Sequence, residues 1–406
     1  MPRTLRRRLR LLLAPHPGWL AVVAALGLVL IGVVAIGLGQ PASADFAAKQ
    51  LAYLPVALLL MAVAAVLPPR LLVDLAYPAL ALAMVMLVVL LLPFMPAAFV
   101  PVRNGARRWF DLQLLSVQPS ELAKIAYVLA LAAWLRYREN YRAVRGLLPP
   151  LILTFVPMGL IVVEPDLGTA LLFLPALFAM LIAAGAKLKH LLAMLLIGLA
   201  LLPAMYPLLQ PHQKQRIVAM VSQVRGETRH RSGIGFQGYK AKTLVGAGQL
   251  TGHNAPHAHN LIHYNDLPEA WNDMIFAVIC TRFGAAGGAG VVALYLLFVA
   301  GGLGCAAVTR DPFARIVAVG ITAVVFAQMF VNVGMTLGIL PITGMTLPFV
   351  SYGGSSLVAN FIMLGLLLNV ASRRSAIIPQ PAFEFDRPRN EPVHRNPHGD
   401  PMAPGK

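Results

Sequence analysis

Long apolar runs alternate with short polar segments along this chain of 406 residues. At a rise of about 1.5 Å per helical residue, a run of about twenty residues crosses a hydrocarbon core about 30 Å thick. Ten such runs can be delimited: residues 19–38, 51–66, 75–94, 122–135, 148–163, 169–184, 188–209, 273–308, 314–337 and 347–371. The pattern predicts an all-α, polytopic membrane protein with about ten transmembrane helices, of which the eighth is long and rich in glycine.

Composition supports this class. Hydrophobic residues make up 58% of the chain and charged residues only 12%, whereas about a quarter of an average soluble domain is charged. The net charge of +17 comes from basic residues between and beyond the apolar runs, not from a basic domain with interleaved aromatics. This distribution argues against nucleic-acid binding and indicates contact with membrane lipids.

The basic residues also predict sidedness. Five arginines precede the first run, which is typical of a cytoplasmic terminus. Alternate loops then carry the basic residues expected inside: Arg70; Arg136, Arg138, Arg142 and Arg145; Lys187 and Lys189; Arg310 and Arg315; Arg373 and Arg374. We therefore expect a multi-pass protein of the bacterial inner (cytoplasmic) membrane with both termini in the cytoplasm. The expected parts are a basic N-terminus (1–17), a transmembrane domain (18–372) with a large extracytoplasmic loop between helices seven and eight (210–272), and a disordered tail (373–406).

Four polar motifs fall on the predicted outer side, at residues 104–124, 164–170, 267–277 and 338–356. Ionisable groups near or within membrane segments are costly and usually face a cavity or a partner. Their convergence on one side predicts an extracytoplasmic site.

Individual side chains in these motifs allow structural as well as functional interpretations. Glu121 and Lys124 are three residues apart on one helix face, where a structural ion pair is the simpler explanation. Arg107 and Arg108 beside Trp109 suit either a headgroup anchor or a clamp on a diphosphate, and the sequence leaves both open.

Other features have similar alternatives. Asp166 fits a helix cap, and the Gly353-Gly354 pair allows either close helix packing or a binding loop. The spacing of four loop histidines permits a divalent metal, although such residues are more often solvated: His253, His257, His259 and His263. Cys280 and Cys305 are expected to be small core residues.

Taken together, the four motifs resemble the SEDS family (shape, elongation, division and sporulation proteins), which includes the rod-shape protein RodA and the division protein FtsW. The resemblance covers roughly residues 104–372, and the stretch MTLGILPITG at 335–344 is closer to RodA. It implies a peptidoglycan glycosyltransferase that polymerises lipid II during cell elongation or division. The implied partner is a class B penicillin-binding protein, which cross-links the product.

The family's essential aspartate corresponds to Asp273, which inherits the role of general base, with a helix cap as the structural alternative. Candidate substrate-binding residues come from the same motifs: Arg107, Arg108, Trp109, Glu121, Lys124, Glu269, Ser351 and Ser355. The family's His-Thr before the aspartate is replaced by Trp271-Asn272. Such departures leave acceptor binding open, together with any need for a divalent cation such as Mg or Mn, and no metal ligand is assigned.

Two rival functions remain at this stage. A lipid II flippase or transporter also needs intramembrane charge, but on both sides of the midplane, and the one-sided motifs favour chemistry. A scaffold without activity, which recruits the penicillin-binding protein, is the other alternative.

Overall fold

The computed structural model describes residues 12–38, 43–102, 106–111, 116–136, 144–208, 211–224 and 235–372. The described chain is helical apart from connecting segments and one small antiparallel hairpin, in which β1 (Phe110–Asp111) pairs with β2 (Ser116–Val117). The all-α prediction is confirmed for this part. Most of the basic N-terminus, Arg103, and the tail from residue 373 lie outside the described residues.

A helix matches each predicted run. They are α2 (Gly18–Ile36), α3 (Ser43–Val66), α5 (Ala76–Leu91), α6 (Pro119–Leu135), α7 (Leu148–Val163), α8 (Leu167–Leu171) with α9 (Phe173–Ala184), α10 (Leu188–Met205), α14 (Ile275–Val308), α15 (Pro312–Thr336) and α16 (Gly354–Ala371). Among the described residues, six spans are long and apolar enough to cross a membrane, and three shorter apolar helices accompany them. The multi-pass prediction holds, whereas the count of ten crossings stays a prediction.

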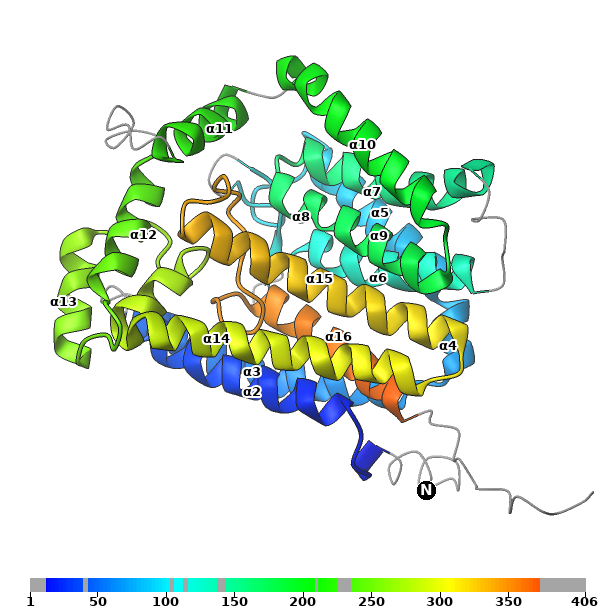
Figure 1. Cartoon of the computed structure of the whole chain (residues 1–406), viewed down its shortest axis with the longest axis horizontal. Coiled ribbons are helices and arrows are strands. Elements are labelled where there is room, and N and C mark those ends of the chain that lie inside the picture. The colour runs from blue at the N-terminus through cyan, green and yellow to red at the C-terminus, as the bar shows by residue number, and fades with distance from the viewer. Residues whose placement is uncertain are drawn as a thin grey trace, which may run out of the picture. The chain divides into compact units, whose positions relative to one another are not determined.

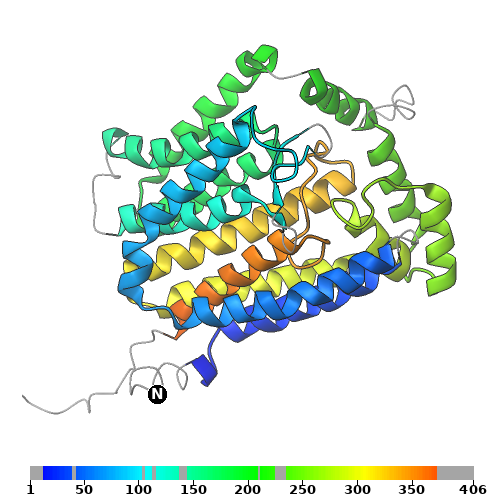
Figure 2. The ribbon, with the colours of Figure 1, turned by 180° about the vertical axis from the view of Figure 1, so that it is seen from behind.

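Helix α15 lies at the centre and packs against α14, α9, α6 and α16 (Figure 1). Behind it, α16 runs beside α3 (Figure 2). Helices α15 and α16 are the most deeply buried of the six candidate spans. By contrast, most described side chains of α10 are exposed, as expected of a helix whose surroundings are lipid. Any site in the interior is therefore built on α15 and α16.

The start of the last predicted helix was wrong. The run at 347–371 begins as an irregular segment, and α16 starts only at Gly354. Pro341 and Pro348 interrupt the segment 338–353, because proline has no backbone N–H to donate to a helix. The result is a non-helical loop that enters the interior between α15 and α16.

The long connection at 210–272 contains helices that the sequence did not reveal: α11 (Pro211–Val224), α12 (Phe236–Ala247) and α13 (Ala255–Asn265). Of these, α12 packs against α14 and α15. The remaining short helices are connectors: α4 (Pro69–Asp74), η2 (Val144–Leu147) and η3 (Tyr206–Leu208).

Helix α14 is long and glycine-rich, as predicted, but it is broken at Gly284, where φ is 71° and ψ is −172°. The N–H groups of Ala285 and Ala286 donate outside the helix, to the carbonyls of Gln249 (2.8 Å) and Leu250 (3.1 Å). A Cβ on Gly284 would lie 2.3 Å from the Leu250 oxygen. The break thus ties the segment between α12 and α13 to α14.

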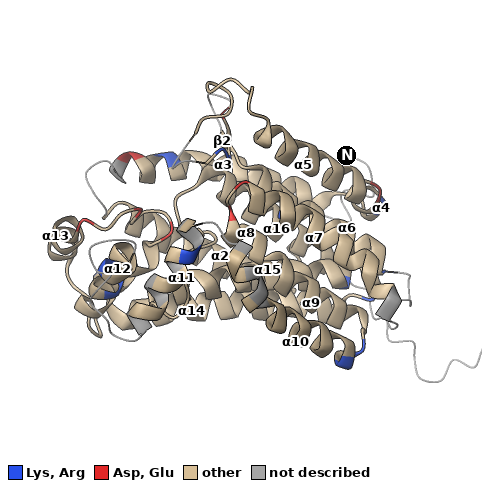
Figure 3. Cartoon of the chain, turned by 90° about the horizontal axis from the view of Figure 1, so that it is seen from above, with Lys and Arg blue, Asp and Glu red and all other residues tan. Residues whose placement is uncertain are grey.

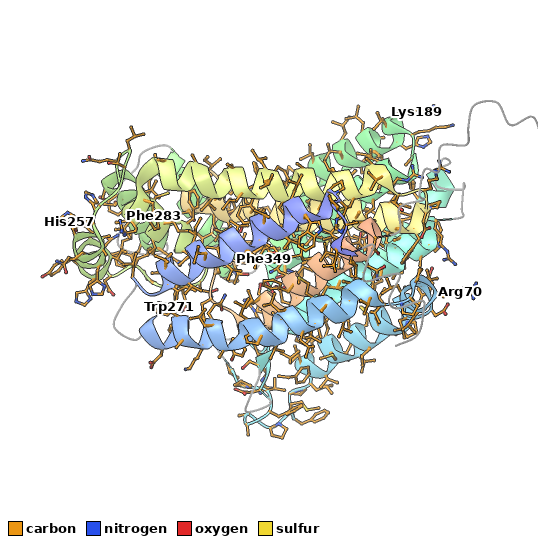
Figure 4. The ribbon with its side chains drawn as sticks, turned by 90° about the horizontal axis from the view of Figure 1, so that it is seen from below. Arg70, Lys189, His257, Trp271, Phe283 and Phe349 are labelled. Carbon is orange, nitrogen blue, oxygen red and sulfur yellow. The ribbon has the colours of Figure 1, made fainter. Side chains whose placement is uncertain are left out.

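The two predicted sides of the membrane correspond to opposite ends of the bundle. Arg70 and Lys189, expected inside, lie at one end, while His257 and Trp271, expected outside, lie at the other (Figure 4). Charged residues are sparse along the helices between these ends (Figure 3). We refer below to the Arg70 end and the Asp273 end.

Candidate active site

Asp273 lies just before α14, and only 5% of its surface is exposed. Gln237 of α12 directs its amide at the carboxylate, with Nε2 at 3.3 Å from Oδ1 and 3.5 Å from Oδ2. On another side the chain passes at Gly344 (φ 73°), where a Cβ would lie 3.9 Å from Oδ2. The N-cap residue of α14 is Met274, without a side-chain cap bond, so Asp273 does not occupy the capping position.

Asn332 of α15 contacts the same segment from the interior. Its Nδ2 donates to the backbone oxygens of Asp273 (2.8 Å) and Met345 (2.6 Å). The side chain therefore joins the chain before α14 to the loop at 338–353.

Glu121 and Lys124 form the predicted ion pair, with Nζ 3.0 Å from Oε1. Lys124 also donates to Oε1 of Gln328 (3.1 Å), and the Gln328 amide donates to the carbonyl of Thr346 (2.9 Å). Both charged residues are buried. Gln328 lies four residues before Asn332, so one face of α15 serves both the ion pair and the Asp273 segment.

The N-termini of α6, α8 and α16 meet beside this pair. The Gln118 N–H donates to Oγ of Ser355 (2.9 Å), and its side-chain amide donates to Ser120 (3.0 Å) and Asp166 (3.4 Å). Asp166 accepts from the N–H of Thr169 (3.2 Å), which confirms the predicted helix cap. Ser355 thus lies beside the ion pair, and its role in substrate binding stays a prediction.

Ser351 and Glu269 brace the chain around Asp273. The Ser351 hydroxyl donates to the carbonyl of Asn272 and accepts from the N–H of Leu347 (2.7 Å). The Asn272 amide in turn reaches Oε2 of Glu269 at 3.5 Å. Both residues lie next to Asp273 in the fold, and their role in substrate binding stays a prediction.

The start of α16 supports the packing interpretation of the glycine pair, and the binding role stays a prediction. Gly354 packs closely on α3, since a Cβ there would lie 2.7 Å from the ring of Tyr53. Ser356, one turn into the same helix, lies 3.2 Å from the hydroxyl of Thr346 and accepts from Asn360. Close packing is confirmed here, and polar contacts accompany it.

Hydrogen bonds and chain neighbours connect all four motifs into one set, which we name the polar network: Gln118, Ser120, Glu121, Lys124, Asp166, Asp273, Gln328, Asn332, Thr346, Ser355 and Ser356. Burying a connected set of polar groups inside a membrane protein costs free energy, and such sets usually mark a functional site.

Arg107 and Arg108 contact different parts of the structure. Arg107 donates to the carbonyls of Leu92 (3.1 Å) and Pro93 (3.2 Å) after α5. Arg108 donates to the carbonyls of Glu164 and Pro165, in the turn that also holds Asp166 of the polar network. Only Arg108 is therefore brought to the network, and Trp109 beside it is partly buried. The joint clamp on a diphosphate stays a prediction.

Glu164, in the turn between α7 and α8, is a buried acid that the sequence analysis did not select. Desolvation, assisted by the nearby Asp166 and opposed by Arg108, raises its pKa to about 9. Its Oε1 has no hydrogen-bond partner among the described residues. Glu164 is therefore mostly neutral at pH 7 and can donate a proton or a hydrogen bond.

Two of the four loop histidines contact backbone carbonyls. His253 contacts the oxygen of Ala247 at 2.8 Å, and His259 contacts that of Leu38 at 3.2 Å. Within the described ranges, no three His, Cys, Asp or Glu side chains are grouped closely enough to hold a metal ion. Cys280 and Cys305 are buried and form no disulfide within the described residues, and their place in the core is as predicted.

Comparison with known proteins identifies the family. The family model described as "Cell cycle protein", which covers FtsW, RodA and SpoVE, matches residues 16–376. The chain belongs to this family, the SEDS family. The match extends beyond the motifs that carried the resemblance, into the first transmembrane helices.

Three SEDS relatives illustrate the similarity. Stage V sporulation protein E of Bacillus subtilis is 34% identical over 66% of this chain and 72% of its own. Peptidoglycan glycosyltransferase MrdB of Escherichia coli K12 is 30% identical over 81% of this chain and 86% of its own. A chain from a solved peptidoglycan synthase complex has 30% identity and a TM-score of 0.75, and the alignment covers 88% of this chain and 98% of that one.

Several members of this SEDS site were missed from the sequence. Gln328 and Asn332 carried a signal, because two amides four residues apart in an apolar helix share a face and are unfavourable in lipid. Gln237 carried none, since it lies in a long connection whose helices were not predicted. Thr346 and Glu164 stood inside selected motifs without being singled out.

Proposed function

We propose that this protein is a peptidoglycan glycosyltransferase that polymerises lipid II into glycan strands at the outer face of the cytoplasmic membrane. The observation that carries the proposal is the polar network, which joins the four family motifs to the backbone of Asp273, whose carboxylate is buried. The activity in the name of MrdB supports the same assignment.

In this proposal Asp273 is the general base. It takes the proton of the acceptor sugar hydroxyl as that oxygen attacks the anomeric carbon of the donor, which typically accelerates a reaction by about 10²–10⁴-fold. The new carbon–oxygen bond forms as the bond to the undecaprenyl pyrophosphate oxygen breaks, and the electron pair leaves with the diphosphate. A single displacement of this kind inverts the anomeric centre. Gln237 donates to both carboxylate oxygens and would orient them towards the hydroxyl.

The remaining network supplies charge for the leaving group. Lys124 lies inside the network and Arg108 at its edge, in contact with the turn that precedes α8. We propose that both stabilise the negative charge that develops on the diphosphate. Lys124 is paired with Glu121 and also donates to Gln328. These two contacts fix the position of its ammonium group, from which it would act on the leaving diphosphate.

The partner and the orientation belong to the proposal as well. The solved relative belongs to a complex that coordinates polymerization and crosslinking, which supports a class B penicillin-binding protein as partner here. We place the Asp273 end outside, as the basic loops indicate. A reporter active only outside the cytoplasm should be active when fused within 210–272 and silent when fused after Arg374. Activity at the second position would reverse the assigned sidedness.

The test is reconstitution of the purified protein in vesicles with lipid II, alone and with a class B penicillin-binding protein. Glycan chains on a denaturing gel are the expected product. Movement of labelled lipid II across the bilayer without chain formation would replace the proposal by a flippase. If the protein neither forms glycan chains nor moves lipid II but still binds its partner, the scaffold interpretation would replace the proposal.

A further inference from the structure

Asn332 is fully buried on α15, and its amide bonds to two separate backbone segments. Both acceptors are carbonyl oxygens, so the Nδ2 group must face them, because the amide oxygen cannot donate. The two oxygens belong to Asp273 and Met345, at 2.8 Å and 2.6 Å. One side chain thus fixes the separation of these segments.

The first segment carries the Asp273 carboxylate, and the second passes beside it. The neighbour of Met345, Gly344, is the position at which a Cβ would lie 3.9 Å from Oδ2. Gln237 reaches the carboxylate from α12, a different element. The Asn332 amide therefore influences, through the backbone of Asp273, where the base lies relative to the loop beside it.

We propose that Asn332 is a positioning residue for Asp273, an inference that rests on the proposed glycosyl transfer. Asn332 acts through the backbone of Asp273 and keeps the carboxylate at the position from which it can accept the proton of the acceptor hydroxyl. A displacement of a reacting group by about 1 Å can slow a reaction by about 100-fold, so a fixed backbone anchor has a kinetic effect.

A purely structural role explains less of what is seen. The Oδ1 atom of Asn332 is buried and has no hydrogen-bond partner in the described part of the chain. Burial of such an acceptor costs free energy, which the two hydrogen bonds from Nδ2 offset. The unpartnered oxygen thus belongs to the residue that anchors the backbone of the carboxylate assigned to catalysis.

Asn369 of α16 provides a matched control at the other end of the helix bundle. It is also buried, and its Nδ2 donates to the carbonyls of Ala64 (2.9 Å), Ala65 (3.0 Å) and Leu67 (2.8 Å). These carbonyls end α3, where intrahelical donors run out. Asn369 has the same chemistry as Asn332 without a link to the base.

The test compares Asn332→Leu with Asn369→Leu in the full-length protein, at matched amounts of folded, monodisperse material. Leucine has the same number of side-chain heavy atoms as asparagine and the same branching at Cγ, and it removes the amide in both variants. Asn332→Leu should lower kcat for lipid II by about 10- to 100-fold, with KM within about twofold, whereas Asn369→Leu should keep the wild-type kcat. Asn332→Ser, which retains one donor, should fold and show an intermediate kcat, and it replaces the leucine variant if that one does not fold.

Hydrogen exchange gives a second readout that needs no activity. Asn332→Leu should speed amide exchange at residues 273–275 and 344–347, and Asn369→Leu should not. Equal kcat in the two variants, or unchanged exchange at these residues, overturns the inference. If the wild-type protein makes no glycan, the proposed function fails, while the exchange measurement still decides whether Asn332 anchors Asp273.

Discussion

The two ends of the helix bundle differ in how they treat buried polar groups. Among the described residues, the buried carboxylate oxygens without a hydrogen-bond partner are Oε2 of Glu121 and Oε1 of Glu164. Both belong to the motifs at the Asp273 end. Two amide oxygens from the same end, those of Asn272 and Asn332, are also without a partner there.

Acidic and amide side chains at the Arg70 end have structural tasks. Asp311 caps α15 by accepting from the N–H of Phe313 (3.1 Å), and Asn369 bonds to the last carbonyls of α3. The same residue types thus complete helix termini at one end and leave oxygens unsatisfied at the other. The contrast concerns acidic and amide oxygens, since the hydroxyl of Thr309 after α14 and Nδ1 of His190 in α10 are also buried without a partner among the described residues. Because a buried oxygen without a hydrogen bond costs free energy, we expect a substrate to supply partners at the Asp273 end.

The largest expected effect separates the aspartates of the two ends. Asp273→Asn should lower polymerisation by at least about 100-fold, because asparagine keeps the size of aspartate but cannot accept the proton. Asp311→Asn should leave the rate unchanged, since asparagine caps a helix about as well as aspartate. Polymerisation rates at matched levels of folded protein check both. A near-normal rate for the first variant would remove the base role from Asp273.

The ion pair gives the next largest effect, on stability. Lys124→Met should destabilise the fold by about 3–5 kcal/mol, because it leaves the buried Glu121 charge without its partner. Glu121→Gln combined with Lys124→Met should be less harmful than Lys124→Met alone, since no uncompensated charge remains. Thermal unfolding in detergent measures the difference. A double variant less stable than the single one would show that the two residues are not coupled as a pair.

Glu164 predicts a pH effect. Its folded pKa of about 9 lies above the ordinary value of 4.5, so its contribution to stability is complete below pH 4.5 and is lost as the pH rises towards 9. Glu164→Gln should therefore match the wild type near pH 5 and gain Tm relative to it near pH 9. The exposed Asp74→Asn serves as a control with no such trend. If the Tm values of wild type and Glu164→Gln change in parallel with pH, the raised pKa of Glu164 would be contradicted.

The arginines predict the smallest effect. Arg107→Ala with Arg108→Ala should weaken binding of a diphosphate lipid in nanodiscs by about tenfold, the loss of roughly one charge-assisted contact. Since Arg108 bonds to the turn of the polar network and Arg107 to the end of α5, Arg108→Ala alone should account for most of the loss. Unchanged affinity with a lowered Tm would make both residues structural anchors.

Most of the helices could be predicted from the sequence, because the lipid surroundings of a membrane-spanning helix require a long run of apolar residues. The helix boundaries that failed have local causes, such as the prolines that delay α16 to Gly354. The Glu121–Lys124 pair and the Asp166 cap were predictable because both depend on spacing within one helix or turn.

The rest of the site depends on contacts between distant segments. Gln237 meets Asp273 across 36 positions of the chain, and Gln328 meets Lys124 across 204. No local periodicity encodes such pairs. The separation of Arg107 from Arg108 was hidden for the same reason, since adjacent residues in an extended segment reach opposite neighbours.

The anomeric configuration of the glycosidic bond tests the central claim, that the Asp273 end joins sugars by one base-assisted displacement. Purified protein would be incubated with lipid II and its partner, and the linkage of the product determined by NMR. The account predicts a configuration opposite to that of the lipid-linked donor. Retention of the donor configuration, or a covalent glycosyl adduct on Asp273 found by mass spectrometry, would contradict it.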